Sequence, residues 1–140
     1  MSDWNTAIIQ EFRDNGGIVG GYFEGKTLLL LASTGARTGN LHTTPLACYQ
    51  DRDAWVIIAS ANGSDSNPAW YHNLKANPRA RIEVGTESFE VEATEASGDE
   101  RDRLYAGMVA ISPQFGEYEK GTERKIPVFR LTRAQPPRRD

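Results

Sequence analysis

The chain has 140 residues, of which 39% are hydrophobic and 25% charged, and its formal net charge is −3. This mixture is typical of one soluble globular domain that needs no disulfide or metal to build its core, and it argues against a disordered chain. The negative net charge argues against nucleic-acid binding, which favours a basic face.

The N-terminal segment predicts a helix over residues 3–14. Trp4, Ile8 and Phe12 recur at helical spacing, and Asp3 is suited to cap the helix. The glycines that follow Asn15 then end it. No basic segment followed by an apolar run precedes the helix, as a signal peptide would require.

The cysteine count and the hydropathy pattern bear on location. Cys48 is the single cysteine, so no intrachain disulfide can form. The longest apolar stretch, Leu28–Ala32, is far too short to cross a bilayer. We therefore expect a cytoplasmic protein without stable membrane insertion.

Short apolar or alternating runs bounded by turn residues predict six strands after the first helix. They cover residues 27–33, 43–49, 54–60, 79–84, 87–94 and 126–131. Short turns between successive strands favour antiparallel pairing, and closure into a small barrel removes the open edges of such a sheet. The pattern therefore predicts an α+β barrel in one domain over residues 1–132, followed by a flexible tail over 133–140.

Two further helices are predicted. One begins at Pro68, behind Asn67 as N-cap, and runs to about residue 76. The other begins behind its cap at residue 97, and it presents Leu104, Met108 and Ile111 on one face.

The stretch from Ser33 to Gly39 is the first candidate site. Its two glycines permit a tight turn that exposes backbone N–H groups, and Arg37 with the hydroxyls of Thr34 and Thr38 adds donors. Such a loop suits a phosphate or another anion, although it matches neither the Walker A nor the GxGxxG pattern. The alternative is a plain strand-connecting turn with an exposed arginine.

A second candidate lies where a strand end, Ala59–Gly63, meets the start of the helix behind Asn67. Free N–H groups at a helix start bind anions or a polarised ring carbonyl. Trp70 and Tyr71 would pack there against a planar ligand. The alternative is that Trp70 and Leu74, four residues apart, form only the core face of the helix.

The third candidate is the stretch 113–118, which precedes the last predicted strand. Phe115 and Tyr118 form an aromatic pair, and the tyrosine hydroxyl can donate to a carbonyl or nitro oxygen. The alternative is that both rings plug the mouth of the barrel.

The other polar residues indicate no further chemistry. His42 and His72 lack the cysteine or carboxylate partners of a zinc site, so no metal is expected. Cys48 is expected to be a buried, inert thiol. The acidic run from Glu87 to Glu95 is expected to be a solvated strand face.

Together these stretches resemble the deazaflavin-dependent nitroreductase family, a branch of the flavin and deazaflavin split-barrel oxidoreductases. The similarity spans residues 12–131 and rests on motifs that occur in family order. They are Thr34–Gly39, Thr44-Pro45-Leu46, Ala59-Ser60, the long Asn67–Pro78 motif and Arg124–Val128.

The resemblance implies a split β-barrel, FMN-binding-like and mainly antiparallel, with flanking helices and a coenzyme groove along one side. The coenzyme is F-420, an 8-hydroxy-5-deazaflavin with a phospholactyl-oligoglutamate tail. Cofactor binding is implied for Arg37, Thr38, His42, Thr44, Pro45, Leu46, Ala59, Ser60, Ala61, Asn67, Trp70 and Tyr71. Arg37 would face the anionic tail, and Tyr118 would edge the substrate cavity.

The implied reaction is hydride transfer from C5 of the reduced coenzyme to an electron-poor acceptor such as a quinone, a nitro-compound or an activated enone. The protein supplies orientation and electrostatics, and Ser60 or Tyr118 would donate a hydrogen bond or proton to the reduced product. The expected partner is thus a small-molecule acceptor, and the expected assembly is a monomer or homodimer.

Two departures from the family pattern reduce the fixed positive charge. His42 stands where relatives often carry a second arginine, and Ala61 stands where some carry a lysine. We therefore expect a weaker hold on a polyanionic tail. The alternatives are an FMN-dependent split-barrel reductase and a non-catalytic barrel that carries a flavin, a tetrapyrrole or a fatty acid.

Overall fold

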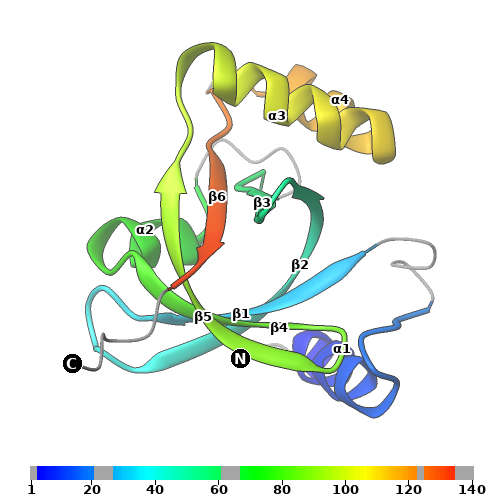
Figure 1. Cartoon of the computed structure of the whole chain (residues 1–140), viewed down its shortest axis with the longest axis vertical. Coiled ribbons are helices and arrows are strands. Elements are labelled where there is room, and N and C mark those ends of the chain that lie inside the picture. The colour runs from blue at the N-terminus through cyan, green and yellow to red at the C-terminus, as the bar shows by residue number, and fades with distance from the viewer. Residues whose placement is uncertain (1–2, 21–26, 61–66, 123–124, 135–140) are drawn as a thin grey trace.

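The computed structural model describes residues 3–20, 27–60, 67–122 and 125–134, which form four helices and six strands (Figure 1). In chain order these are α1 (Asp3–Asp14), β1 (Leu28–Thr34), β2 (Leu41–Asp51), β3 (Ala54–Ile58), α2 (Ala69–Ala76), β4 (Arg79–Val84), β5 (Glu87–Glu95), α3 (Gly98–Ile111), α4 (Gln114–Lys120) and β6 (Val128–Arg133). The first helix and all six strands lie where the sequence predicts them, to within a few residues.

The strands close into one barrel in the order β1-β2-β3-β6-β5-β4, and every neighbouring pair is antiparallel. β1 pairs with β2 on one side and with β4 on the other, where Leu31 lies opposite Ile82. Each described strand therefore has two partners and no open edge. In Figure 1, α3 and α4 lie together at one end of the barrel and α1 lies at the other. The predicted antiparallel α+β barrel is confirmed.

The apolar run Leu28–Leu31 is buried along its whole length. Its odd-numbered residues join the barrel core, and its even-numbered residues pack with Ile8 and Phe12 of α1. Alternate residues of a strand point to opposite faces, so a strand covered on both sides requires an uninterrupted apolar run. Each leucine buried in this way stabilises the fold by about 1.5–3 kcal/mol.

A tyrosine of β2 fastens α3 to the barrel. The hydroxyl of Tyr49 donates a hydrogen bond to the carbonyl oxygen of Leu104 at 2.7 Å. The approach requires glycine at position 107, because a Cβ on Gly107 would lie 2.5 Å from the Tyr49 hydroxyl oxygen. Tyr105 in turn donates to the carbonyl oxygen of Phe115 at 2.6 Å, which joins α3 to α4.

The helix α4 was not predicted from the sequence. It has only 7 residues, begins behind Pro113 and contains Gly116, so it shows little helical periodicity. The prediction for α3 was also wrong at one position, since Ile111 is 58% exposed while Leu104 and Met108 are buried. Ile111 is the last residue of α3, and the chain turns away from the core after it.

Prolines set two element bounds differently from the prediction. Pro68, with ψ of 159°, is the N-cap of α2, so the helix begins at Ala69 and Asn67 is not its cap. β6 begins at Val128 because Pro127 has no N–H to give to the ladder. The carbonyl oxygen of Pro127 instead accepts from the Ala59 N–H at 2.9 Å. The tail was predicted over 133–140, but Arg133 is the last residue of β6, and residues 135–140 lie outside the described part of the chain.

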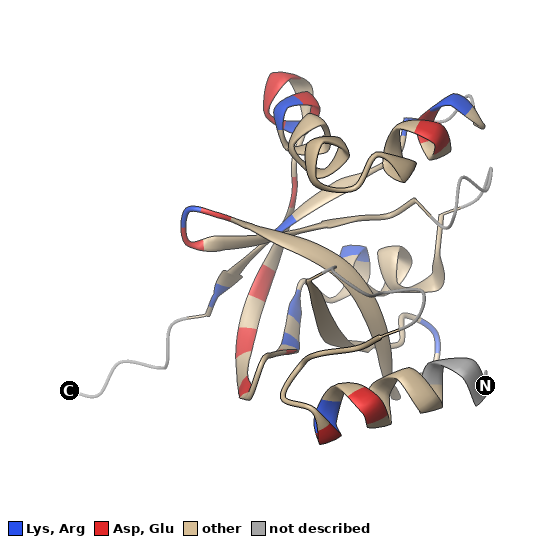
Figure 2. Cartoon of the chain, turned by 90° about the vertical axis from the view of Figure 1, so that its right-hand side faces the viewer, with Lys and Arg blue, Asp and Glu red and all other residues tan. Residues whose placement is uncertain are grey.

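Two expectations about titratable groups are confirmed. Cys48 is buried, and burial raises the pKa of its thiol to about 12, so the thiolate is scarce at neutral pH. The acidic residues of β5 lie on a solvated face beside basic residues of β4, as Figure 2 shows by red and blue bands on neighbouring strands. Glu90 pairs there with Arg79 at 3.1 Å, with both side chains about half exposed.

Candidate functional site

A groove of about 720 Å³ lies between α1, the β1–β2 connection and α2. Its volume is within the usual range for a small-molecule site. The described residues that line it are Thr6, Ile9, Gln10, Arg13, Gly35, Ala36, Arg37, Thr38, Leu41, His42, Thr43, Thr44, Ala69, Trp70 and Asn73. The first predicted site, the turn after β1, thus meets part of the second, the start of α2.

The β1–β2 turn closes on itself by hydrogen bonds. Gly35 N–H donates to the Asn40 carbonyl oxygen at 2.7 Å, and Gly39 N–H donates to the Gly35 carbonyl oxygen at 2.9 Å. Asn40 N–H donates to the Thr38 hydroxyl oxygen at 3.2 Å. The expectation that the turn exposes its N–H groups is therefore wrong for these three residues, because the tight turn uses them. Donors for an anion come mainly from side chains, above all from Arg37.

Two glycines make this turn possible. Gly39 has φ of 76°, a left-handed conformation that side chains other than glycine's strain to adopt. A Cβ on Gly35 would lie 2.9 Å from the Thr38 hydroxyl oxygen and 3.0 Å from Nε2 of His42. The turn is thus packed tightly against two of the predicted site residues.

Asn73 of α2 holds the turn in place. Its Oδ1 accepts from the Ala36 N–H at 3.0 Å, and its Nδ2 donates to the Ser33 hydroxyl oxygen at 3.2 Å. The side chain is buried, with only 8% of the residue exposed. Sequence analysis gave this residue no role. The available signal was a polar residue between Trp70 and Leu74 on the buried face of α2.

The groove gathers part of the predicted cofactor set. Arg37, Thr38, His42, Thr44 and Trp70 line it. Pro45, Leu46, Ala59, Ser60, Asn67 and Tyr71 are not among the described lining residues, and Ala61 lies outside the residues that the structure describes.

The residues beyond the groove lie in or near the barrel core. Ala59 is fully buried in the same core cluster as Trp70, with Leu46 and Tyr71 packed against that cluster. Ser60 follows Ala59 and is only 8% exposed. Trp70 therefore belongs to the core face of α2, which was the alternative considered for it, and it also lines the groove. Its packing against a planar ligand stays a prediction.

The predicted aromatic pair of the third candidate site is confirmed. Phe115 and Tyr118 lie on α4 with ring centroids 5.3 Å apart and edge to face. Phe115 is buried in a second core cluster between the barrel and α3, and Tyr118 packs against that cluster. Neither residue is among the described residues that line the groove. The structure thus places Tyr118 apart from the Arg37 turn.

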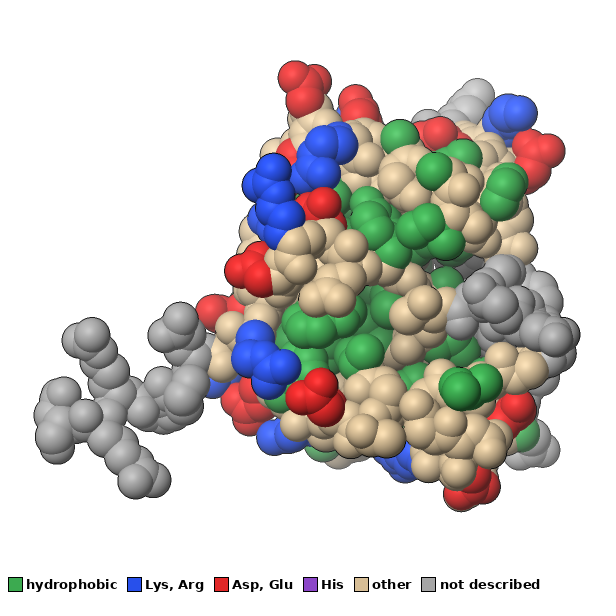
Figure 3. All heavy atoms as spheres, turned by 45° about the vertical axis from the view of Figure 1, so that its right-hand side comes forward, with side chains coloured by type: hydrophobic (Ala, Val, Ile, Leu, Met, Phe, Trp, Pro, Cys, Tyr) green, Lys and Arg blue, Asp and Glu red, His purple; other side chains and the backbone are tan. Residues whose placement is uncertain are grey.

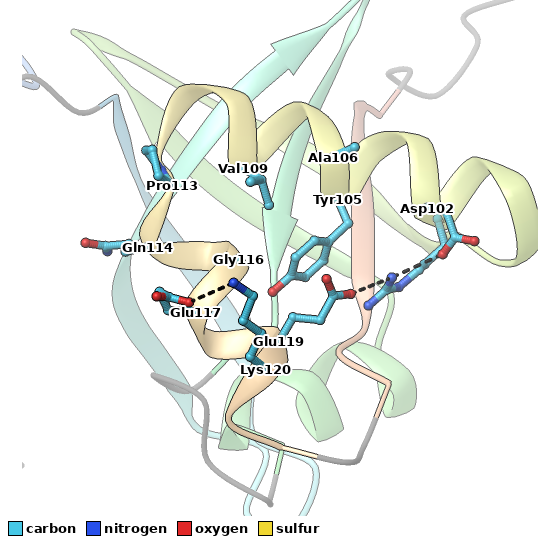
Figure 4. A pocket seen from close by; sticks show the side chains of 11 residues that line it. Asp102, Tyr105, Ala106, Val109, Pro113, Gln114, Gly116, Glu117, Glu119 and Lys120 are labelled. Atoms are coloured by element: carbon cyan, nitrogen blue, oxygen red, sulfur yellow. Dashed lines mark hydrogen bonds and ion pairs between the residues drawn. The ribbon is translucent and has the colours of Figure 1, made fainter.

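A second hollow, of about 840 Å³, lies between α3 and α4 (Figure 4). Its charged groups are paired with one another: Arg101 with Asp102 and Glu119 at 3.1 and 3.3 Å, and Lys120 with Glu117 at 3.4 Å. Pro113, Gln114, Gly116 and Glu117 of the third candidate stretch line it, but Tyr118 is not among its described lining residues.

The groove differs from that hollow in its charge. Arg13, Arg37 and His42 line it, and no aspartate or glutamate is among its described lining residues. This is notable in a chain with 19 acidic residues against 16 lysines and arginines. Guanidinium groups with threonine hydroxyls and an indole wall suit a ligand that has a planar body and an anionic tail. The donor set therefore fits a deazaflavin with a phosphate and carboxylates.

Within the described residues, no group of three or more histidine, cysteine, aspartate or glutamate side chains is placed to hold a metal ion. No helix in the described part of the chain is long and apolar enough to span a membrane.

The closed antiparallel barrel with flanking helices is a split-barrel fold with a basic groove. A family model described as F420H(2)-dependent quinone reductase matches residues 4–133. An F420H(2)-dependent quinone reductase of Mycobacterium tuberculosis is 42% identical over 110 residues, which cover 75% of this chain and 72% of that protein. The chain belongs to the F420H(2)-dependent quinone reductase family.

Solved structures agree with this assignment. An F420-H2-dependent reductase, FDR-A, is 32% identical with a TM-score of 0.69, covering 74% of this chain and 92% of its own. A structure described as a domain-swapped dimer is 28% identical with a TM-score of 0.72, covering 92% and 97%. The heme storage protein HutZ of Vibrio cholerae, with a TM-score of 0.58 over 94% and 92%, is 18% identical and shares the fold alone. The predicted family, split-barrel fold and coenzyme F-420 are confirmed.

Proposed function

We propose that this chain uses reduced F-420 to reduce a quinone, with the groove between α1, the β1–β2 turn and α2 as the seat of the coenzyme's anionic tail. The observation that carries the proposal is the charge of this groove, which has arginines on two walls and no described acidic lining residue. Family membership supports both the coenzyme and the quinone. Nitro-compounds and activated enones are proposed as further acceptors, since they are electron-poor in the same way.

When bound, the coenzyme supplies a hydride from its C5 carbon. The protein's part is to bind, orient and exclude water. Arg37 would hold the tail by charge-assisted hydrogen bonds, with Thr38 and His42 as further donors. Thr44, Pro45 and Leu46 would lie along the ring system, and Asn67, Trp70 and Tyr71 would enclose it.

The acceptor needs an apolar surface and a proton. Hydrophobic side chains gather in a hollow of one face, below the part of the surface that α3 and α4 form (Figure 3). We assign the quinone ring to this region, with Ala59 and Ser60 on the coenzyme side. Ser60 Oγ or Tyr118 Oη then donates a hydrogen bond or proton to the oxygen that gains charge.

Fluorescence titration with oxidised F-420, and with FMN in parallel, tests the coenzyme assignment. We expect saturable binding of F-420 and much weaker binding of FMN. Arg37→Gln should weaken F-420 binding about fivefold, since an exposed ionic contact contributes about 1 kcal/mol. Arg52→Gln, in the β2–β3 turn away from the groove, is the control. Preferential binding of FMN would contradict the proposal.

Oxidation of reduced F-420 by a quinone then tests the reaction. Tyr118→Phe and Ser60→Ala should separate the two proposed donors, because the true donor's loss lowers kcat with little effect on coenzyme affinity. Unchanged kcat in Tyr118→Phe would remove the tyrosine from this role.

Location and assembly remain proposals. We propose a cytoplasmic protein, supported by its single buried cysteine, because oxidising compartments favour proteins with disulfides. We propose a monomer or homodimer, and the domain-swapped neighbour makes size-exclusion chromatography at several concentrations the direct test.

A further inference from the structure

One face of helix α1 packs on the core and another lines the groove. Ile8 and Phe12 point to the core and pack with β1. Thr6, Ile9, Gln10 and Arg13 line the groove. These positions follow the i, i+3, i+4, i+7 spacing of one helical face, so a continuous stripe of α1 forms a wall of the groove.

The only basic residue of α1 lies on this stripe. Arg13 is in the last turn of the helix, and its side chain is 50% exposed. Glu83 of β4 holds its guanidinium in a bidentate arrangement, with Nε 3.1 Å from Oε1 and Nη2 2.7 Å from Oε2. This fork fixes the orientation of the guanidinium and occupies one of its edges. The remaining N–H groups, on Nη1 and the second hydrogen of Nη2, stay available to a further anion.

Arg13 and Arg37 lie on different walls of the same groove, one from α1 and the other from the β1–β2 turn. Among the described residues, no carboxylate forms an ion pair with Arg37. Arg13 thus brings a second guanidinium to the groove that Arg37 lines.

We propose that Arg13 is a second cationic anchor for the anionic tail of F-420, and that Glu83 positions its guanidinium at the cost of part of its charge. The proposal rests on the function proposed above and assigns a specificity role to α1. It implies that the chain distinguishes the tailed coenzyme from the same deazaflavin without phosphate or glutamates through two arginines from different walls of the groove.

The test compares binding of F-420 with binding of the tail-free deazaflavin, by fluorescence titration at low salt. Arg13→Gln should weaken F-420 binding about fivefold and leave the tail-free deazaflavin unaffected. Glu83→Gln keeps an acceptor for Nε and removes a negative charge beside the groove, so F-420 should bind about twofold more tightly. Arg13→Lys should restore most of the lost affinity.

Thermal melts of the same samples separate binding from folding. Arg13→Gln and Glu83→Gln break the same ion pair. If this pair had only a structural role, both variants would change in the same direction in melting temperature and in F-420 affinity. Opposite shifts in F-420 affinity support the proposal. Arg79→Gln is the control, since Arg79 is similarly exposed and also pairs with a glutamate but is not among the described lining residues of the groove.

Two results would overturn the inference: unchanged F-420 affinity in Arg13→Gln, or an equal loss for both ligands. Failure of the wild-type chain to bind either deazaflavin is a different outcome, because it would remove the proposed function as well.

Discussion

The two hollows of this molecule have similar volumes, about 840 and 720 Å³, but opposite electrostatic character. Between α3 and α4, each basic group faces carboxylates on the same two helices. In the groove beside the β1–β2 turn, the basic groups come from different elements, and the described lining contains no acid. The larger hollow is thus neutralised by its own side chains. In the smaller one Arg13 pairs with Glu83, outside the described lining, whereas no described carboxylate pairs with Arg37, so its charge stays available to a ligand.

Volume is therefore a poor guide to a binding site when the charged groups of the lining already pair with one another. Arg101 shows this most clearly. Its guanidinium is buried, donates twice to the Ile126 carbonyl oxygen at 3.1 and 2.8 Å, and stacks 4.6 Å from the centroid of the Tyr105 ring. Such a group holds helices together and has little left for a ligand.

The largest effect is expected for Arg101→Ala. The substitution removes two charge-assisted hydrogen bonds and leaves the buried Ile126 carbonyl without them, at a cost of about 3 kcal/mol in unfolding free energy. F-420 affinity of the folded protein should stay unchanged. Urea denaturation with parallel titration checks both, with Arg79→Ala as an exposed control. A loss of affinity at full stability would mean that the α3–α4 hollow binds the coenzyme.

A smaller loss is expected for Asn73→Ala. Ala36 N–H and Ser33 lose their partner, which costs about 2 kcal/mol in stability. In contrast to Arg101→Ala, this change should also weaken F-420 binding severalfold, because the turn that carries Arg37 is no longer held to α2. Asn77→Ala, at the exposed end of the same helix, should affect neither quantity. If the Asn73 and Asn77 variants bound F-420 equally tightly, the β1–β2 turn would not be part of the coenzyme site.

The smallest effect is expected for the ion pair that joins α3 to β2. Arg103 of α3 donates to the two carboxylate oxygens of Asp51 in β2, at 3.2 and 3.3 Å. The hydrogen bond from Arg103 lowers the pKa of Asp51 below its usual 3.8. The pair therefore contributes stability above pH 3.8, and the contribution disappears as the pH falls through the lowered pKa. The melting temperatures of wild type and Arg103→Gln should differ slightly at pH 7 and become equal in acid. A gap that persists in acid would contradict the assignment.

The fold was predictable where one physical signal dominates. The alternation of apolar and polar residues, the turn residues and the apolar run Leu28–Leu31 predicted the barrel. The run is uninterrupted because a strand covered on both sides leaves no room for polar residues. α4 was missed because seven residues with a glycine carry too little pattern. Pro68 was read as a helical residue, although its extended ψ makes it the cap.

The site was predictable only in part, for a reason that lies in distance along the chain. The motif residues Arg37, Thr38, His42, Thr44 and Trp70 line one groove, and their contact with the coenzyme stays a prediction. Arg13 and Asn73 were missed because their roles depend on contacts with residues 70 and 37 positions away, Glu83 and Ala36. Periodicity shows which face of a helix is apolar, but it does not show which residues the polar side chains contact.

The closed barrel has a consequence for truncated chains. β6 pairs with β3 and with β5, so it completes two ladders that no other described strand completes. Without residues 128–133, β3 and β5 would each keep an unpaired edge, and the barrel could not close. A chain that stops before Val128 is therefore expected to aggregate through those two edges rather than fold.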